Sequence, residues 1–444
     1  MLRPAFVLVL CARAASANPA ADVPAGIDDA GGRVDAIGTL DYEFEQDSSQ
    51  IWREHIGDPT ASSNSPLPTE RDLAFRQSRH TITPRLDIGL YHDTWISVAL
   101  PVIVNQSRQL SLDSGVDRTT SSTVTDGFLP PAGFDAQNNG GATAGDVMFR
   151  GVDRRGLDQI HLGIGVAPMN QARDPSKPTW KLGAELRLAI GDVMKFDPTM
   201  PGANTAVGYG VHELRLWTSF DRKVGLFEPH MDLWWQAPIG TTKDSLFDYP
   251  ASGSGFGATN TGKGMQAGTH FGVEINAYDD PVNHDHVGID LGGVVTAHFE
   301  GRDYSEMWEV FANNPQLALD ADPVTPGMQT LPYPGISNIE QYLETRLTAA
   351  VRASIGPKVH FAATFALMWE TDHSITFADA GVVLPTCGAT MTTGCVQMGD
   401  GNIIQPGTAE VNPLHNDKID LVGHRYLSQD NFGYILGAQG EVLF

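Results

Sequence analysis

Charged side chains recur at every second position in runs whose other positions are apolar. In residues 180–190, Lys181, Glu185 and Arg187 alternate with tryptophan, leucine, alanine and isoleucine. In an extended strand this alternation turns the charged groups to one face. Both signs on one face predict either an aqueous lumen with a transverse field or a set of structural ion pairs. The candidate lumen-lining residues are Lys181, Glu185, Arg187, Glu213, Arg215, His270, Glu274, Asp290, His298, Glu344, Arg346, Arg352 and Glu370.

Other groups that could do chemistry are sparse. His284 to His286 crowds ligand-type side chains into a turn, and Asp400 to Asn402 does not continue into a full calcium-binding loop. His373 and Ser374 are adjacent, but neighbours on a strand face opposite ways, so they make a poor nucleophile and base pair. We therefore expect no enzymatic activity, no metal site and no cofactor.

The polar faces belong to strands that are long enough to cross a bilayer at a tilt, which takes about 9 to 11 residues. Bacterial single-chain barrels use even strand numbers. The sequence shows thirteen candidate strands, so we predict fourteen, with one further strand in 106–142 or 191–208, and keep twelve as the alternative. The segments with a period of two are 33–45, 78–91, 94–105, 143–153, 157–167, 179–191, 209–221, 226–238, 264–278, 286–300, 338–355, 358–371 and 433–444.

The connections between these segments alternate in length. Short links fall at 92–93, 222–225, 279–285 and 356–357, and the long ones occupy 46–75, 106–142, 239–263, 301–336 and 373–431. Short periplasmic turns and long extracellular loops are typical of outer-membrane barrels. The sequence therefore predicts an all-β, antiparallel, up-and-down transmembrane barrel.

Aromatic side chains on the apolar faces gather at the strand ends, as the interfacial girdles of a membrane barrel do. The sequence places Phe220, Phe227 and Phe444 at the short-turn end. The girdle residues placed at the long-loop end are Trp180, Trp235, Phe299, Trp369 and Tyr434.

The beginning of the chain is typical of a secretory signal. A basic start, an apolar run and the small residues Ala15 to Ala17 predict a signal peptide over 1–17. We expect a short periplasmic segment over 18–32 and a single barrel domain over 33–444. Cys387 and Cys395 then meet an oxidising compartment, and we expect them to form a disulfide in a Gly/Thr-rich loop.

Two loops carry features of their own. Residues 106–142 are long and rich in Ser, Thr, Gly and Pro, and would either fold inward to constrict a pore or shield it from outside. The segment after Asp303 begins like a helix, with Tyr304, Trp308 and Phe311 on one face. This helix would be either a lid over an apolar ligand or a packing element on the barrel rim.

The net charge of the chain limits the classes of molecule that it is expected to bind. The chain carries a net charge of -24, and removing Arg3 and Arg13 with the signal leaves 27 bases against 53 acids, or -26. Nucleic acid is therefore excluded as an expected partner. The acids between strands serve either solubility or divalent-cation binding at a lipopolysaccharide surface.

Together these features resemble Gram-negative outer-membrane transport barrels, with a final strand that ends at Phe444. The assembly signal of such barrels has a glycine five residues before the terminal aromatic, where this chain has Gln439 beside Gly440. Residues 18–20 match a tripeptide of the long-chain fatty-acid transporter family, although they begin the mature chain and leave too few residues for that family's plug.

The resemblance implies outer-membrane lipid, lipopolysaccharide and the barrel-assembly machinery as partners, a small solute of unknown identity, and a monomer or homotrimer. The leading functional hypothesis is a channel for passive passage of small solutes. The alternatives are a hydrophobic-compound transporter with a lateral opening and a non-conducting structural or surface-receptor barrel.

Overall fold

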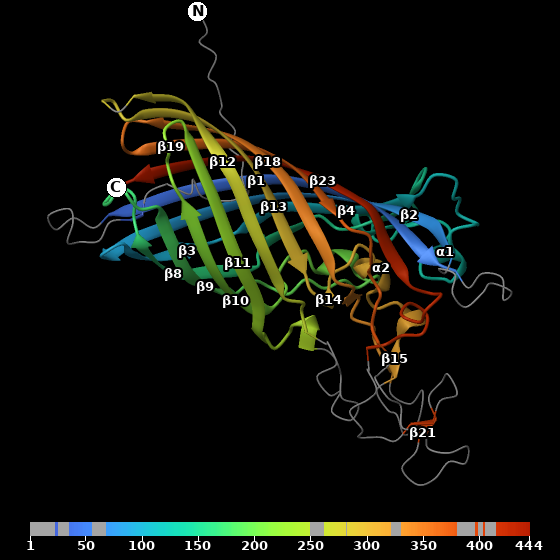
Figure 1. Ribbon diagram of the computed structural model, residues 1–444. Helices are drawn as coiled ribbons and strands as arrows, with labels where there is room; N and C mark the ends of the chain where they lie inside the picture. Colours follow the sequence, from blue (N-terminus) through green and yellow to red (C-terminus); the bar gives the residue numbers. More distant parts are fainter. Residues whose placement is uncertain are drawn as a thin grey trace, which may run out of the picture.

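The chain folds into a closed antiparallel barrel of 12 wall strands, shown from the side in Figure 1. The computed structural model describes residues 23–24, 35–55, 68–248, 262–280, 282–320, 330–379, 396–397, 403–404 and 414–444. Among these residues no helix is both long enough and apolar enough to cross a membrane.

Every wall strand is hydrogen-bonded to a neighbour on each side. The ring closes where β1 meets β23, with Ile37 opposite Leu443. The amide of Phe444 donates to the carbonyl oxygen of Ala36 over 2.9 Å. The wall strands and their pieces are β1 (Ala36–Glu54), β2 (Thr69–Tyr91), β3 (Thr94–Ala99), β4 (Val102–Leu112), β6 (Val147–Arg150), β7 (Arg154–Leu157), β8 (Gln159–Met169), β9 (Thr179–Ala189), β10 (Val211–Asp221), β11 (Phe227–Thr241), β12 (Gln266–Asp280), β13 (Asp285–His298), β18 (Tyr342–Ile355), β19 (Val359–Glu370) and β23 (Tyr426–Leu443).

The predicted fold class is confirmed, and the strand number is the alternative of 12 rather than the favoured fourteen. Segments 143–153 and 157–167 are pieces of one wall strand, because β6 and β7 pair with β4 while β8 pairs with β3. β3 and β4 are in turn one strand, broken at Pro101, and both lie along β2. Pro101 has no amide hydrogen for the ladder, which explains a break at that point.

The predicted alternation of connection lengths is present. Five short turns lie at the end of the barrel where the chain also finishes, and the long loops lie at the other end (Figure 1). The first turn is tight, with His92 and Asp93 at φ of 41° and 57°, the left-handed geometry of a two-residue hairpin. The first long loop is shorter than the predicted 46–75, because β1 continues to Glu54 and β2 begins at Thr69.

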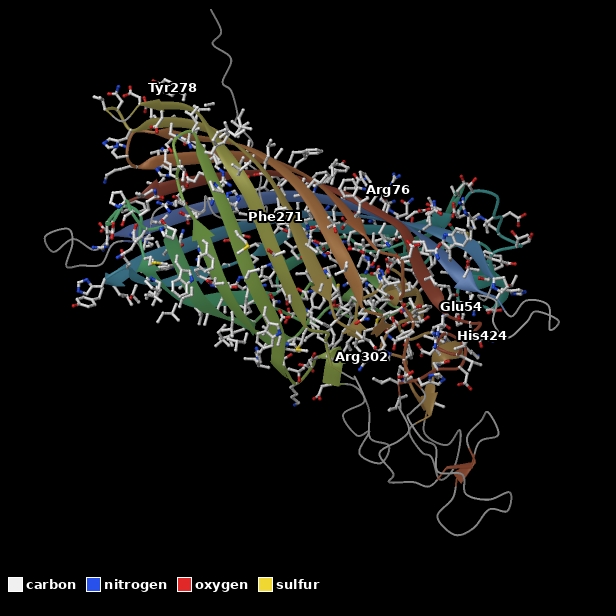
Figure 2. The ribbon with its side chains drawn as sticks, in the orientation of Figure 1. Glu54, Arg76, Phe271, Tyr278, Arg302 and His424 are labelled. Atoms are coloured by element: carbon white, nitrogen blue, oxygen red, sulfur yellow. The ribbon has the colours of Figure 1, made fainter. Side chains whose placement is uncertain are left out.

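The barrel is apolar outside and charged inside. Exposed apolar side chains occur on almost every wall strand, and Phe271, which is 51% exposed, is one of those labelled in Figure 2. Glu54 and Arg76 lie toward the long-loop end of the same view, and Tyr278 lies at the short-turn end. A soluble barrel would bury its apolar face, whereas a lipid-spanning barrel turns that face outward. The fold therefore has the polarity of a membrane barrel.

The long loops form an apolar core at the long-loop end of the barrel. We call the described parts of loops 113–146, 190–210, 299–341 and 371–425 the cap. Trp308 and Phe311, both fully buried, lie at the centre of this core together with side chains from the upper wall. The cap elements are β5 (Phe134–Asp135), β14 (Gly301–Asp303), β15 (Leu319–Asp320), β16 (Thr330–Leu331), β17 (Ser337–Ile339), β20 (His373–Ser374), β21 (Val396–Gln397), β22 (Ile403–Ile404), α1 (Ser122–Thr125), α2 (Trp308–Phe311) and the 3-10 turns η1 (Ala136–Asn138), η2 (Pro201–Ala203) and η4 (Pro315–Leu317). The turn η3 (Leu246–Asp248) lies in the loop after β11.

Candidate functional site: the lumen

A cavity of about 750 Å³ lies inside the barrel below the cap. Inward-facing residues of the wall strands line it, and Tyr304, Ser305 and Glu306 of the cap lie against it from above. Pro24, which is buried, also lines the cavity. The interior is thus a chamber with a roof made by the cap.

Most of the lining residues expected from the sequence are brought to this cavity. They come from β9, β10 and β12 on one side and from β18, β19 and the end of β13 on the other. Those that line it are Lys181, Glu185, Arg187, Arg215, His270, His298, Glu344, Arg346 and Glu370.

The remaining four predicted residues also face inward and form ion pairs, but none of the four lines the cavity. Glu213 is buried near the cap, with its Oε1 3.0 Å from Nζ of Lys263. Arg352 lies nearer the short turns, where its Nη2 is 3.1 Å from Oδ2 of Asp290 and its Nε is 3.5 Å from Oε2 of Glu274. These pairs brace the wall.

Inward charges are segregated around the barrel. The arc formed by β18, β19, β23 and β1 is acidic, and the arc formed by β2, β4, β8, β9 and β10 is basic. Opposed arcs of this kind set up an electric field across the lumen. The acidic arc contains Asp41, Glu43, Glu45, Asp47, Glu344, Glu370 and Glu441, and the basic arc contains Arg79, Arg85, Arg108, His161, Lys181, Arg187 and Arg215.

Each arc also contains charges of the opposite sign, and three of these, Asp87, Glu185 and Arg346, are neutralised by a neighbour two positions along the same strand. The Nε of Arg85 lies 2.7 Å from Oδ2 of Asp87, and the Nε of Arg187 lies 2.7 Å from Oε1 of Glu185. The Nε of Arg346 lies 2.5 Å from Oε1 of Glu344. The other two exceptions described above, Arg352 and Glu213, pair with residues outside their own strands. Because these opposite charges are paired, the difference in sign between the two arcs persists.

The strongest part of the acidic arc was not among the predicted lining residues. Asp41, Glu43, Glu45 and Asp47 occupy alternate inward positions of β1. Their spacing is the signal that could have identified them, because four acids in a period of two within a strand mark one face. Reading the first strand as ending near residue 45 left this row incomplete.

Buried arginines fasten the cap to the wall. Arg53, Arg108 and Arg154 are each less than a tenth exposed and extend from β1, β4 and β7. Nη1 of Arg53 lies 2.5 Å from Oδ2 of Asp126. Nη2 of Arg108 donates to the carbonyl oxygen of Ser305 over 2.8 Å. Each contact joins a wall strand to a loop that is distant in sequence.

The third of these arginines holds the short helix α2. Nη2 of Arg154 lies 2.8 Å from Oε1 of Glu309, and Arg154 also donates to carbonyl oxygens of loop 190–210. The guanidinium carbons of Arg154 and Arg108 lie 4.8 and 5.8 Å from the centre of the Trp308 ring, within cation–π range. The segment after Asp303 does contain a helix, but this helix begins at Trp308 and not at Asp303, so Tyr304 lies before it. Trp308 and Phe311 pack into the cap core.

Burial in the cap shifts the pKa of acidic groups there. Desolvation raises the pKa of Asp420 to about 6, although its carboxylate accepts hydrogen bonds from the amides of Asn416 and Ala378. Desolvation likewise raises the pKa of Asp303, against the opposing attraction of Lys263. The cap thus contains acids that are costly to ionise while it is closed.

The aromatic girdle is placed as expected with one exception. Phe220, Phe227 and Phe444 are at the short-turn end, and Trp235, Phe299, Trp369 and Tyr434 lie toward the long loops. Trp180 lies at the short-turn end instead, where its ring stacks on Phe220 with centres 5.6 Å apart. Dividing one wall strand into two had reversed the direction assigned to β9.

Two expectations lie outside the described residues. Cys387 and Cys395 belong to this part of the chain, so their disulfide stays a prediction. The signal segment 1–17 does too, as does segment 18–32 apart from Val23 and Pro24. Within the described ranges, no group of three or more His, Cys, Asp or Glu side chains is arranged to hold a metal ion.

Among solved structures, the chain is similar to outer-membrane barrels at low TM-scores and low identity. No family model matches the sequence, and no curated protein matches it. A Pseudomonas aeruginosa FadL homologue aligns with a TM-score of 0.33 and 9% identity over 92% of this chain and 90% of its own. The TodX monoaromatic hydrocarbon channel aligns at 0.30 and 9% over 92% and 90%. The outer membrane protease OmpT from Escherichia coli aligns at 0.27 and 8% over 93% and 96%. At these TM-scores the similarities assign neither a subfamily nor an activity.

Proposed function

We propose that the protein is an outer-membrane channel for small polar or charged solutes, closed at its outer mouth by the cap in the state described here. The observation that carries the proposal is the chamber of about 750 Å³, which lies between opposed acidic and basic arcs. The barrel around it has apolar side chains on its outer surface. A barrel that served only as an anchor would gain nothing from segregating its interior charges into two arcs.

The orientation follows from the connections. Outer-membrane barrels keep short turns in the periplasm and long loops outside. The cap then faces the cell exterior, and both the start of β1 and Phe444 face the periplasm. Solutes would pass when the cap is displaced, entering a lumen whose transverse field orders charged and dipolar molecules as they move.

A polar lumen favours this function over transport of hydrophobic compounds. All wall strands are paired on both sides, and the cavity under the cap is lined by charged side chains on most strands. A lateral gap or an apolar pocket beneath the loops would have favoured the hydrophobic alternative.

A non-conducting structural or receptor barrel is the second candidate, and the packing of the cap favours it. Trp308 and Phe311 are fully buried, as in the core of a stable domain, and many inward charges are paired. This candidate requires that the cap never opens.

Liposome swelling and planar-bilayer recording separate these functions. We expect reconstituted protein to admit small neutral and charged solutes and to show discrete current steps, with neutralisation of the acidic arc changing ion selectivity. Protein that conducts neither as wild type nor after the cap is loosened by Glu309→Gln would refute the channel and support the structural barrel.

A further inference from the structure

Three tryptophans point into the lumen at one level of the barrel. Trp217 of β10 is directly opposite Trp234 of β11 in the ladder, and Trp95 of β3 is opposite Gly165 of β8, which is in turn opposite Gly183 of β9. Gly183 is opposite Trp217. All three tryptophans line the cavity. They form a continuous row on one inner wall, which we call the aromatic platform.

Each ring of the platform occupies space above a glycine on the adjacent strand. A Cβ added to Gly165 would lie 2.3 Å from Cζ2 of Trp95, and one added to Gly183 would lie 2.6 Å from Cζ2 of Trp217. The rings of Trp95 and Trp217 approach to 6.3 Å between centres. Rings held against backbone in this way have little freedom to move, so they present a rigid surface to the lumen.

The third ring follows the same pattern. A Cβ added to Gly268 would lie 2.6 Å from Cε2 of Trp234. Covering a glycine with an aromatic ring stabilises a sheet by itself. That role needs no cavity, yet the three rings lie together on the chamber wall, where most other inward positions are charged or small.

Basic groups flank the platform on both sides. The guanidinium carbon of Arg215 lies 4.6 Å from the centre of the Trp234 ring. Arg215 is one inward position above Trp217 on β10, and Lys181 is one inward position below Gly183 on β9. Asp232, one inward position below Trp234, is the acid beside the platform, and its Oδ2 lies 3.0 Å from Nδ1 of His270. The opposite wall is the acidic arc. An anionic group on a ligand is therefore attracted to the platform side and repelled from the other side.

We propose that the aromatic platform binds solutes that combine a planar aromatic ring with a carboxylate. The ring stacks on the tryptophans, and the carboxylate lies among the basic groups beside them. A chamber of about 750 Å³ is within the usual size of small-molecule sites. This inference rests on the proposed function, because it names the solute class that the channel would admit.

Equilibrium dialysis of labelled benzoate against purified full-length protein in detergent tests the platform. Cyclohexanecarboxylate, benzyl alcohol and benzylammonium serve as competitors that remove the planar ring, the charge, or the sign of the charge. We expect saturable benzoate binding, and competition by each of the three at least severalfold weaker than by unlabelled benzoate. Absence of saturable binding, or cyclohexanecarboxylate competing as well as benzoate, would overturn the proposal.

Variants locate the binding. Replacing one stacking ring, in Trp217→Leu or Trp234→Leu, should weaken benzoate binding roughly 2- to 12-fold, the range of a single aromatic contact. Trp235→Leu is the matched control, because Trp235 is the next residue on the same strand and faces outward. Trp234→Phe keeps a ring and should retain most of the affinity, which guards against a folding defect. Equal affinities for Trp234→Leu and Trp235→Leu would refute the platform.

Solute flux separates this proposal from the channel itself. Benzoate binding that depends on Trp217 and Trp234, in protein that shows no current or swelling, would leave the platform standing and refute the channel. Current and swelling in the wild-type protein, together with benzoate binding that the platform variants do not weaken, would leave the channel standing and refute the platform.

Discussion

Breaking the buried ion pair between Arg154 and Glu309 should open the cap. Both groups are almost fully buried, and Glu309→Gln keeps the shape of the side chain while leaving the arginine charge uncompensated. Removing one partner of a buried pair costs about 3 to 5 kcal/mol. We take the lower end, about 3 kcal/mol, because Arg154 keeps its bonds to the carbonyl oxygens of Lys195 and Ala206.

About 3 kcal/mol corresponds to a change of roughly a hundredfold in the ratio of closed to open cap. Single-channel recording measures that ratio as the fraction of time spent conducting. The double variant Arg154→Met with Glu309→Leu should close the cap again, because replacing a buried pair by apolar groups is often neutral or stabilising.

The matched control is Asp279→Asn, which breaks an exposed ion pair at the short-turn end. In this pair Nζ of Lys223 lies 2.8 Å from Oδ2 of Asp279. We expect no change in open fraction, since exposed pairs contribute little. Heat-dependent migration in gels checks that each barrel remains folded. If Glu309→Gln and Asp279→Asn gave the same open fraction in folded barrels, the cap would not be held as described.

The raised pKa of Asp420 favours the closed cap at low pH: its contribution is complete below about pH 4, the ordinary range of the group, and is lost as the pH rises through about 6. The open fraction should therefore increase from pH 4 to pH 7, by at most roughly a hundredfold, with only about tenfold of that between pH 5 and pH 7. Asp420→Asn should flatten the increase, and an identical pH profile in the variant would contradict this. Neutralising the acidic arc with Asp41→Asn and Glu45→Gln should move the reversal potential in a salt gradient toward anion selectivity, and an unchanged potential would count against a transverse field. Gly183→Val would place its Cβ 2.6 Å from the Trp217 ring, so overpacking of about 1 to 3 kcal/mol should lower the temperature at which the barrel unfolds in gels. Unfolding at the wild-type temperature would mean that the ring lies elsewhere.

The barrel could be predicted from the sequence because its strands obey a period of two. The row from Asp41 to Asp47 and the run from Lys181 to Arg187 show that period within a dozen residues. Strand pieces β6, β7 and β8 do not, because the chain breaks at Gly151 to Asp153, where a side chain at Gly151 would come within 2.7 Å of Glu309. Interpreting this local break as a turn divides one wall strand into two, and this is how the predicted number of strands came to exceed 12.

The cap could not be predicted to the same degree. Its core depends on contacts between Trp308, Arg108 and Arg154, which lie on a loop and two wall strands far apart in the chain. Such contacts have no period, and each segment alone is consistent with an exposed loop. The helical character of the segment after Asp303 was visible, but the surface on which it packs was not.

The ion pairs within single strands also bear on how the barrel is made. Arg85 and Asp87, Glu185 and Arg187, and Glu344 and Arg346 are each separated by one residue along an extended chain. Such a pair is in reach as soon as its own strand extends, before any neighbouring strand has been added. A strand that brings its own counter-charge can enter the bilayer edge of a growing sheet with its inner face already neutralised, which lowers the desolvation cost of insertion.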